Sequence, residues 1–151
     1  MTIFNREYLG HVSEPASVQV ELGQLRLFAK AIGETRDIYL DEAAARQAGY
    51  RSVLAPPSFG TCLWSLAPRT GPDAEELGID YRYLLHGEES FSYQGLIFAG
   101  DTITLQDRID KMYEKKGGAM DFMELVATAT NQLGEQVQQR RTTLIMRRPQ
   151  A

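Results

Sequence analysis

The feature that most limits how this chain can fold is the run from Ser58 to Leu66, which is apolar on nearly all sides and carries no charged residue. A helix that is apolar around its circumference has to be buried, because its side chains would otherwise face water. Pro56 and Pro57 suit the start of such a helix, where backbone N–H groups have no partner inside the helix, and Pro68 ends it. The run therefore predicts a buried central helix.

The half of the chain that follows alternates between apolar and polar residues, which is the pattern of half-buried strands. The apolar positions with a period of two are Phe91 and Tyr93, then Ile103, Leu105 and Ile109, and then Met123, Leu125, Ala127 and Ala129. Turn-forming residues separate these strands at 99–101, 117–118 and 131–134. Long strands joined by short turns predict an antiparallel meander, and we expect its strands to wrap the central helix. The expected fold class is α+β.

Upstream of the central run, alternation around Val18 predicts a short strand, and two helices are expected after it. The first covers 22–32, where apolar residues recur at threes and fours, and Gly33 suits its C-terminal end. The second is rich in alanine and ends at Gly49. Asp41 stands at its start, where we interpret the side chain as a helix cap rather than a catalyst. Residues 67–80 have the composition of an exposed loop.

Composition limits the function classes. A chain of 151 residues predicts one domain over 1–151, and a net charge of −4 counts against a nucleic-acid partner. The sequence contains neither an apolar run of the roughly 18 residues needed to span a membrane nor a secretory signal. The single cysteine, Cys62, excludes an internal disulfide and a cysteine-rich metal site, so no metal is expected. These observations favour a cytoplasmic protein that does not act at a membrane.

Six short motifs carry a resemblance to a known family. They are AIGET at 31–35, YLDEAAA at 39–45, GYR at 49–51, APPSF at 55–59, LHGEESF at 85–91 and AGDT at 99–102. In this order they resemble the MaoC-like dehydratase/hydratase family, in its N-terminal or FAS1-like type, over about residues 5–148. The resemblance implies the hot-dog fold, an antiparallel sheet wrapped around the central helix. It also implies 3-hydroxyacyl or 2-enoyl thioesters as substrates, with coenzyme A or carrier-protein phosphopantetheine as part of the substrate and no other cofactor.

The resemblance also implies where catalytic residues would lie. Active members carry Gly-Asp-x-Asn-Pro-x-His after the first helix; here Glu34 takes the place of the aspartate, Asp37 that of the proline and Tyr39 that of the histidine. Dehydration removes an α-proton and protonates the leaving hydroxyl, so two groups with a pKa near neutrality must face each other. An ordinary phenol titrates near about 10, so Tyr39 suits a hydrogen-bond donor better than a proton shuttle.

Three further residues are candidates for substrate binding. The family stabilises the thioester enolate with a backbone N–H at the start of the central helix. The ungapped match places Pro57 there, which has no N–H, and a shift by one residue would offer Ser58 instead. Ser65 falls where active hydratases carry a serine, although it could equally be a hydroxyl bonded within its own helix.

The altered loop leaves two accounts open. In the favoured account, the chain is a subunit of an (R)-specific 3-hydroxyacyl-thioester dehydratase/2-enoyl-thioester hydratase, and a partner holds the complete Asp/His motif. In the other, Glu34, Asp37 and Tyr39 form a variant catalytic site. Two rival functions remain, a non-catalytic acyl-binding subunit and a hot-dog thioesterase, although 58–66 lacks the carboxylate that a thioesterase would use. Because one sheet leaves open edges, we expect a homodimer or a heteromer with a second MaoC-like subunit.

Overall fold

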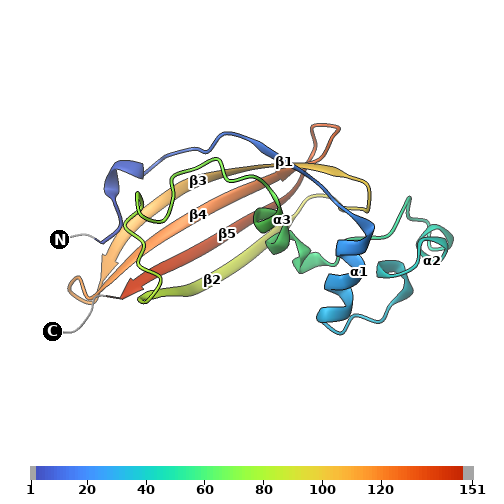
Figure 1. Cartoon of the computed structure of the whole chain (residues 1–151), viewed down its shortest axis with the longest axis horizontal. Helices are drawn as coiled ribbons and strands as arrows, with labels where there is room; N and C mark the ends of the chain where they lie inside the picture. Colours follow the sequence, from blue (N-terminus) through green and yellow to red (C-terminus); the bar gives the residue numbers. More distant parts are fainter. Residues whose placement is uncertain (1–2, 148–151) are drawn as a thin grey trace.

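The computed structural model describes residues 3–147 and contains a five-stranded antiparallel sheet with three α-helices (Figure 1). The strands are β1 (Ala16–Gln19), β2 (Leu84–Tyr93), β3 (Thr102–Lys115), β4 (Met120–Thr130) and β5 (Gln136–Arg147). The helices are α1 (Leu22–Ala31), α2 (Glu42–Gln47) and α3 (Gly60–Leu66), and single 3-10 turns occupy Arg6–Tyr8, Asp37–Tyr39 and Pro57–Phe59. We call the sheet face that α3 contacts the inner face.

The order of strands across the sheet is β1-β3-β4-β5-β2. The predicted meander is present in β3, β4 and β5, which are consecutive neighbours. Its extension to β2 is wrong, because β2 pairs with β5 rather than with β3, with Phe91 opposite Arg140. The alternation of residues sets which face a side chain occupies, but it carries no information on which strands become neighbours. As a result, β2 forms an edge of the sheet.

The central helix lies on the inner face of the sheet, as expected, and is preceded by the 3-10 turn at Pro57–Phe59 (Figure 1). Phe59 and Leu63 are buried in one core cluster with Ala129 of β4. The other side of the helix is open within this chain, where Ser65 is exposed and Leu66 is 41% exposed. A single sheet covers only one side of a helix, so the expected burial of this helix on all sides is not reached within one chain.

Gly60 sets how closely α3 approaches the sheet. A Cβ atom at this position would lie 1.9 Å from Oε1 of Gln138, a buried side chain of β5. Real Cβ atoms do not come so close to an oxygen, so a larger residue would require the buried Gln138 side chain or the helix to shift. The glycine is therefore required by packing and not by its backbone angles, which are helical.

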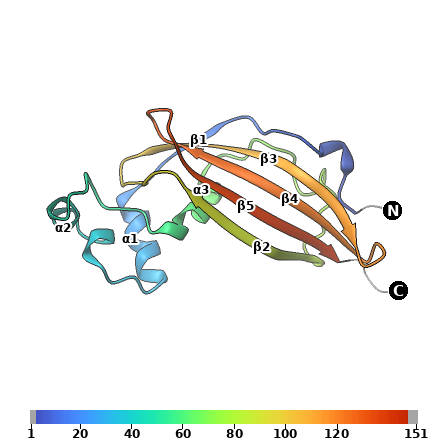
Figure 2. The same ribbon diagram turned by 180° about the vertical axis from the view of Figure 1, so that it is seen from behind.

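The two N-terminal helices lie together at one end of the sheet (Figure 1). As predicted, α1 is followed by Gly33, whose positive φ of 73° suits a residue without a side chain. The predicted cap is also confirmed, since Oδ1 of Asp41 accepts a hydrogen bond from the backbone N–H of Ala44 at 2.8 Å. In the described part of the chain, no helix covers the outer face of the sheet (Figure 2), and none is long and apolar enough to cross a membrane.

Candidate functional site

The loop between α1 and α2 holds the Glu34 carboxylate with its own neighbours. Oε1 accepts hydrogen bonds from the backbone N–H groups of Thr35 and Arg36 at 3.0 and 2.9 Å, and Oε2 accepts one from Nη2 of Arg36 at 2.6 Å. The side-chain hydrogen bond with Arg36, supported by that from its backbone, lowers the pKa of Glu34 to about 2. A carboxylate with so low a pKa is a weak base at neutral pH, so this geometry suits a residue that orders the loop.

Tyr39 and Pro57, both predicted from the family motif, line the same pocket of about 150 Å³ at the start of α3. Tyr39 is buried, and the guanidinium carbon of Arg36 lies 4.9 Å from the centre of its ring. The carbonyl oxygen of Pro57 accepts hydrogen bonds from the Tyr93 hydroxyl at 3.1 Å and from Nε2 of Gln138 at 3.3 Å. At this position the pocket therefore presents a carbonyl oxygen, not the backbone N–H that binds an enolate in the family's active members.

The remaining candidates are dispersed. Asp37 and Ser58 are exposed and do not line this pocket, and Glu34 does not line it either. Ser65 lies near the other end of α3, where it lines a larger pocket. The structure thus brings Tyr39 and Pro57 together in one pocket, whose lining does not include Glu34 or Asp37.

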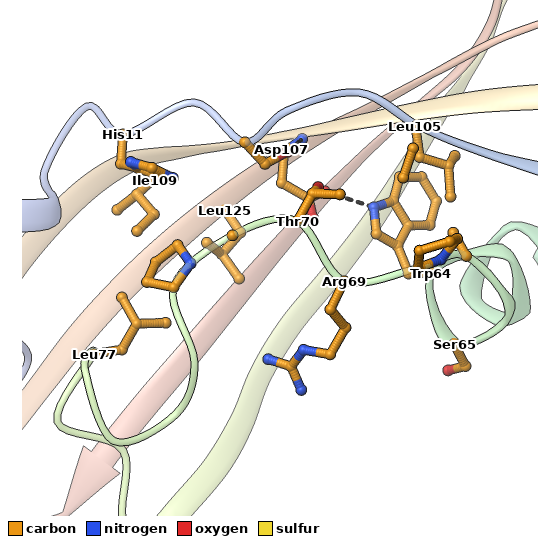
Figure 3. A pocket seen from close by; sticks show the side chains of 16 residues that line it. His11, Trp64, Ser65, Arg69, Thr70, Leu77, Leu105, Asp107, Ile109 and Leu125 are labelled. Atoms are coloured by element: carbon orange, nitrogen blue, oxygen red, sulfur yellow. Dashed lines mark hydrogen bonds between the residues drawn. The ribbon is translucent and has the colours of Figure 1, made fainter.

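The larger pocket has a volume of about 450 Å³ and lies beside α3 (Figure 3). Three parts of the chain form its walls: the segment around 11–16, the end of α3 with the loop that follows it, and the inner faces of β3 and β4. Its apolar lining includes Trp64, Leu77, Leu105, Ile109 and Leu125, and its polar lining includes His11, Ser65, Arg69 and Asp107. A cavity of this size and mostly apolar character suits an acyl chain or a ligand of similar bulk.

Asp107 is the acidic side chain of this pocket, and it is tied to the central helix. Nε1 of Trp64 donates a hydrogen bond to its Oδ1 at 2.5 Å (Figure 3). The guanidinium carbon of Arg140 lies over the same indole, 5.2 Å from the centre of the Trp64 ring. Burial raises the pKa of the Asp107 carboxyl above its usual range, while the Trp64 hydrogen bond and the positive charge of Arg140 act in the opposite direction.

The sheet register explains this arrangement. Asp107 pairs with Ala127, and Ala127 pairs with Arg140, so the three side chains lie in one row on the inner face. Trp64 contacts the two outer members of this row, since it donates a hydrogen bond to Asp107 and its ring faces Arg140. Asp107 was not among the residues predicted from the sequence. A signal was available, because this aspartate occupies an inward position between Leu105 and Ile109 in the period of two.

Two other types of site are a reactive cysteine and a metal centre. Cys62 is half-buried in the core, and burial raises the pKa of its thiol, which makes it a poorer nucleophile. Within residues 3–147, no three side chains of His, Cys, Asp or Glu are grouped so that they could hold a metal ion.

Comparison with known families gives a direct match. The family model described as the FAS1-like dehydratase domain region matches residues 7–140, which is most of the chain. The chain belongs to the FAS1-like dehydratase domain family. Among curated relatives, a UPF0336 protein of Thermobifida fusca is 33% identical over 144 residues, covering 95% of this chain and 93% of the relative. A UPF0336 protein of Clavibacter michiganensis is 36% identical over 118 residues, covering 77% and 78% of the two chains.

Solved structures resemble this FAS1-like dehydratase domain over nearly its whole length. A crystal structure of the C-terminally truncated HadBC (3R-hydroxyacyl-ACP dehydratase) complex from Mycobacterium tuberculosis superposes with a TM-score of 0.73 and 26% identity, covering 91% of this chain and 96% of that chain. A MaoC-like dehydratase gives a TM-score of 0.79 and 25% identity, with 93% of this chain covering 42% of the other. These matches confirm the MaoC-like hot-dog fold and the α+β class.

Proposed function

We propose that this FAS1-like dehydratase domain is the acyl-binding subunit of an (R)-specific 3-hydroxyacyl-thioester dehydratase/2-enoyl-thioester hydratase. The observation that carries the proposal is the state of the loop after α1. Its carboxylate, Glu34, is occupied by Arg36 and by backbone N–H groups, while a pocket of about 450 Å³ remains beside α3. The chain is thus equipped to hold a substrate and poorly equipped to transfer its protons.

The proton transfers would then come from a second MaoC-like subunit that carries the complete Gly-Asp-x-Asn-Pro-x-His loop. The HadBC (3R-hydroxyacyl-ACP dehydratase) complex supports such an arrangement, because one of its chains is 26% identical to this one. The substrate would bring its own carrier, coenzyme A or phosphopantetheine, so the proposed reaction requires no further cofactor.

The surface left open by the fold supports assembly with a second subunit. β2 is an edge strand whose residues are almost all exposed, and an edge strand presents unpaired backbone N–H and C=O groups. Large apolar side chains accompany it, since Leu85 and Tyr93 are 47% and 52% exposed. Leu66 and Leu96, at the end of α3 and in the loop after β2, are 41% and 53% exposed. A homodimer or a heteromer would cover these groups.

One observation favours a second candidate, a variant catalytic site in the chain itself. Tyr39 and Pro57 share the smaller pocket, so a phenol lies near the start of the central helix as the family pattern requires of its histidine. In this account, Tyr39 donates a hydrogen bond to the substrate and Glu34 or Asp37 acts as the base.

A thioesterase is disfavoured by the chemistry around α3. The helix itself carries no carboxylate. Glu89 of β2 comes nearest, with the Thr61 hydroxyl donating to its Oε1 at 3.3 Å, but this carboxylate is ion-paired with Arg140. A carboxylate held by a guanidinium is a weak base for activating water.

The proposal is tested with two assays on the purified chain, one for hydration of an enoyl-CoA and one for release of free thiol. The chain can show hydration, thiol release or neither. The proposal predicts neither for the chain alone, and hydration once a second subunit with the complete Asp/His loop is added. Hydration by the chain alone would favour the variant site, and thiol release would favour the thioesterase. An absence of hydration in the two-subunit complex would contradict the proposal.

A further inference from the structure

The wall of the 450 Å³ pocket is interrupted by a carboxylate that is only partly satisfied. Asp107 follows Leu105 and precedes Ile109 on the inner face of β3, and all three residues line the pocket. Among the described residues, its hydrogen-bond partner is Trp64, which binds Oδ1. Oδ2 accepts no hydrogen bond from residues 3–147, so it is available to a molecule that enters the pocket.

A second polar atom of the pocket lining is also without a partner. His11 lies beside Ile109 (Figure 3), and its Nε2 is buried without a hydrogen bond from the described residues. A buried polar atom without a hydrogen bond destabilises a protein by about 1–3 kcal/mol unless water or a ligand supplies the missing partner. Together with Oδ2 of Asp107, which accepts no hydrogen bond from the described residues, this buried nitrogen indicates a ligand that is not a plain hydrocarbon.

We propose that this pocket selects acyl chains that carry a hydroxyl group away from the reacting carbons, with the hydroxyl donating a hydrogen bond to Oδ2 of Asp107. The inference rests on the proposed function, because it takes the pocket to hold an acyl chain. An unsubstituted chain would displace water from Oδ2 and would supply no hydrogen bond in its place. It should therefore bind more weakly than the hydroxylated chain.

The charges around Asp107 decide which polar group fits. Its carboxylate accepts hydrogen bonds and does not donate them, so it matches a hydroxyl and does not match an ether oxygen or a ketone. A cationic ligand is disfavoured by Arg140, which lies over the Trp64 indole, and by Arg69, which lines the same pocket. The apolar remainder of the lining suits the methylene groups of the same chain.

The test uses Trp64, the single tryptophan of the chain, which both lines the pocket and binds Asp107. Its fluorescence is followed while the full chain is titrated with fatty acids of increasing length that end in a methyl, a methoxy or a hydroxyl group. These probes lack the thioester, so the measurement does not depend on catalysis. We expect the hydroxylated chain of matching length to bind about 10-fold more tightly than both others, as one hydrogen bond of typical strength implies.

Two variants separate the effect of the Asp107 carboxylate on binding from a general effect of charge removal. Asp107→Asn retains an oxygen for Trp64 and turns an N–H₂ donor toward the pocket, so the methoxy chain should bind as tightly as the hydroxylated one. Asp110→Asn removes the same charge from a residue of β3 that is ion-paired with Arg108 and Arg141 and does not line the pocket, so the 10-fold preference should persist.

The outcomes are distinguishable from a failure of the proposed function. Equal binding of all three probes to the unmodified chain, or a hydroxyl preference unchanged by Asp107→Asn, would overturn the inference even if the two-subunit enzyme hydrates enoyl thioesters. No fluorescence response to any probe would overturn it as well. A hydroxyl preference without any hydratase activity would support the pocket assignment while the proposed reaction fails. Because the first comparison needs no variant, the test does not depend on Asp107→Asn folding.

Discussion

At the scale of single residues, the buried and partly buried carboxylates differ in which groups they pair with. Glu34 is bound by Arg36 within its own loop, Asp101 is buried beside Arg51, and Asp107 has the indole N–H of Trp64. Sequence comparison with the family motif finds Glu34 because it occupies a motif position. It cannot find that Arg36, two residues away, occupies the carboxylate, because that depends on the conformation of the loop.

The first prediction concerns the acidity of Glu34. Its pKa of about 2 lies below the ordinary 4.5, so its interactions stabilise the fold at pH values above the ordinary pKa, and this contribution is lost as the pH falls toward about 2. Replacing Arg36→Gln should raise the Glu34 pKa toward the ordinary value, as measured by NMR titration of the side-chain carboxyl. Arg46→Gln, which removes an exposed ion pair with Glu42, should leave it unchanged; a Glu34 midpoint near 4.5 in the unmodified protein would contradict the geometry.

The second prediction concerns Asp101, which is 1% exposed. Its Oδ2 accepts a hydrogen bond from the backbone N–H of Phe98 at 2.8 Å, and its Oδ1 accepts one from Nε2 of Gln132 at 2.9 Å and is paired with Arg51. Asp101→Ala should lower the free energy of unfolding by about 2–4 kcal/mol in urea denaturation, because several donors lose their acceptor.

An exposed carboxylate provides the control for this measurement. Asp80 is ion-paired with Arg82 at the surface, and the two side chains are 37% and 78% exposed. Asp80→Ala should leave the free energy of unfolding nearly unchanged, because exposed ion pairs contribute little to stability. Equal destabilisation by the two substitutions would contradict the claim that the buried contacts of Asp101 stabilise the protein more than an exposed ion pair does.

At the scale of elements, local features of the fold could be predicted from the sequence, whereas long-range features could not. The helix at α1, the cap at Asp41 and the turns between β3, β4 and β5 follow from local patterns, and the structure confirms them. The pairing of β2 with β5 could not be predicted, because strand order depends on contacts between distant segments. The same holds for the larger pocket, whose walls come from three separated parts of the chain.

The third prediction tests how α3 is seated on the sheet. Gly60→Ala places a methyl group 1.9 Å from the original position of Gln138 Oε1, so it should destabilise the protein by about 1–3 kcal/mol. The double variant with Gln138→Ala should recover part of this loss, because the two substitutions act on one contact.

Gly23 in α1 is a matched control for this glycine. A Cβ at Gly23 would meet nothing within 4 Å, so Gly23→Ala should leave stability unchanged or raise it by up to about 1 kcal/mol in thermal unfolding. A loss of stability at Gly23 that matches the loss at Gly60 would contradict the assignment of the Gly60 effect to the contact with Gln138, because Gly23 has no such contact.

At the scale of the whole molecule, the fold places two pockets at opposite ends of the central helix. The smaller pocket with Tyr39 lies at the start of α3, and the larger pocket with Ser65 and Asp107 lies at its end. The central helix thus presents two cavities, while its outer side and the β2 edge remain open to a second subunit. The family resemblance predicted the fold, which the comparisons confirm, but the hydrogen bonds that hold Glu34 within its own loop became clear only from the structure.

The fourth prediction tests whether the larger pocket holds the acyl chain. Leu125→Trp adds bulk to its wall, so the two-subunit enzyme should show a KM for long-chain enoyl thioesters raised about 10-fold or more, with little change for short chains. Leu133→Trp introduces the same residue at a position that is 74% exposed in the turn between β4 and β5, and it should change neither value. Equal effects on short and long chains would argue against an acyl pocket at this site.

The division of labour between two subunits is tested most directly by the hydration rate of the complex after substitutions on either side. With Glu34→Gln and Tyr39→Phe combined in this chain, we expect kcat to stay within about 3-fold of the unmodified complex, whereas His→Asn in the partner's Asp/His loop should reduce it about 100- to 10,000-fold, the range typical of losing a general acid–base group. A loss of that size from the changes at Glu34 and Tyr39, with the partner's loop intact, would contradict the account.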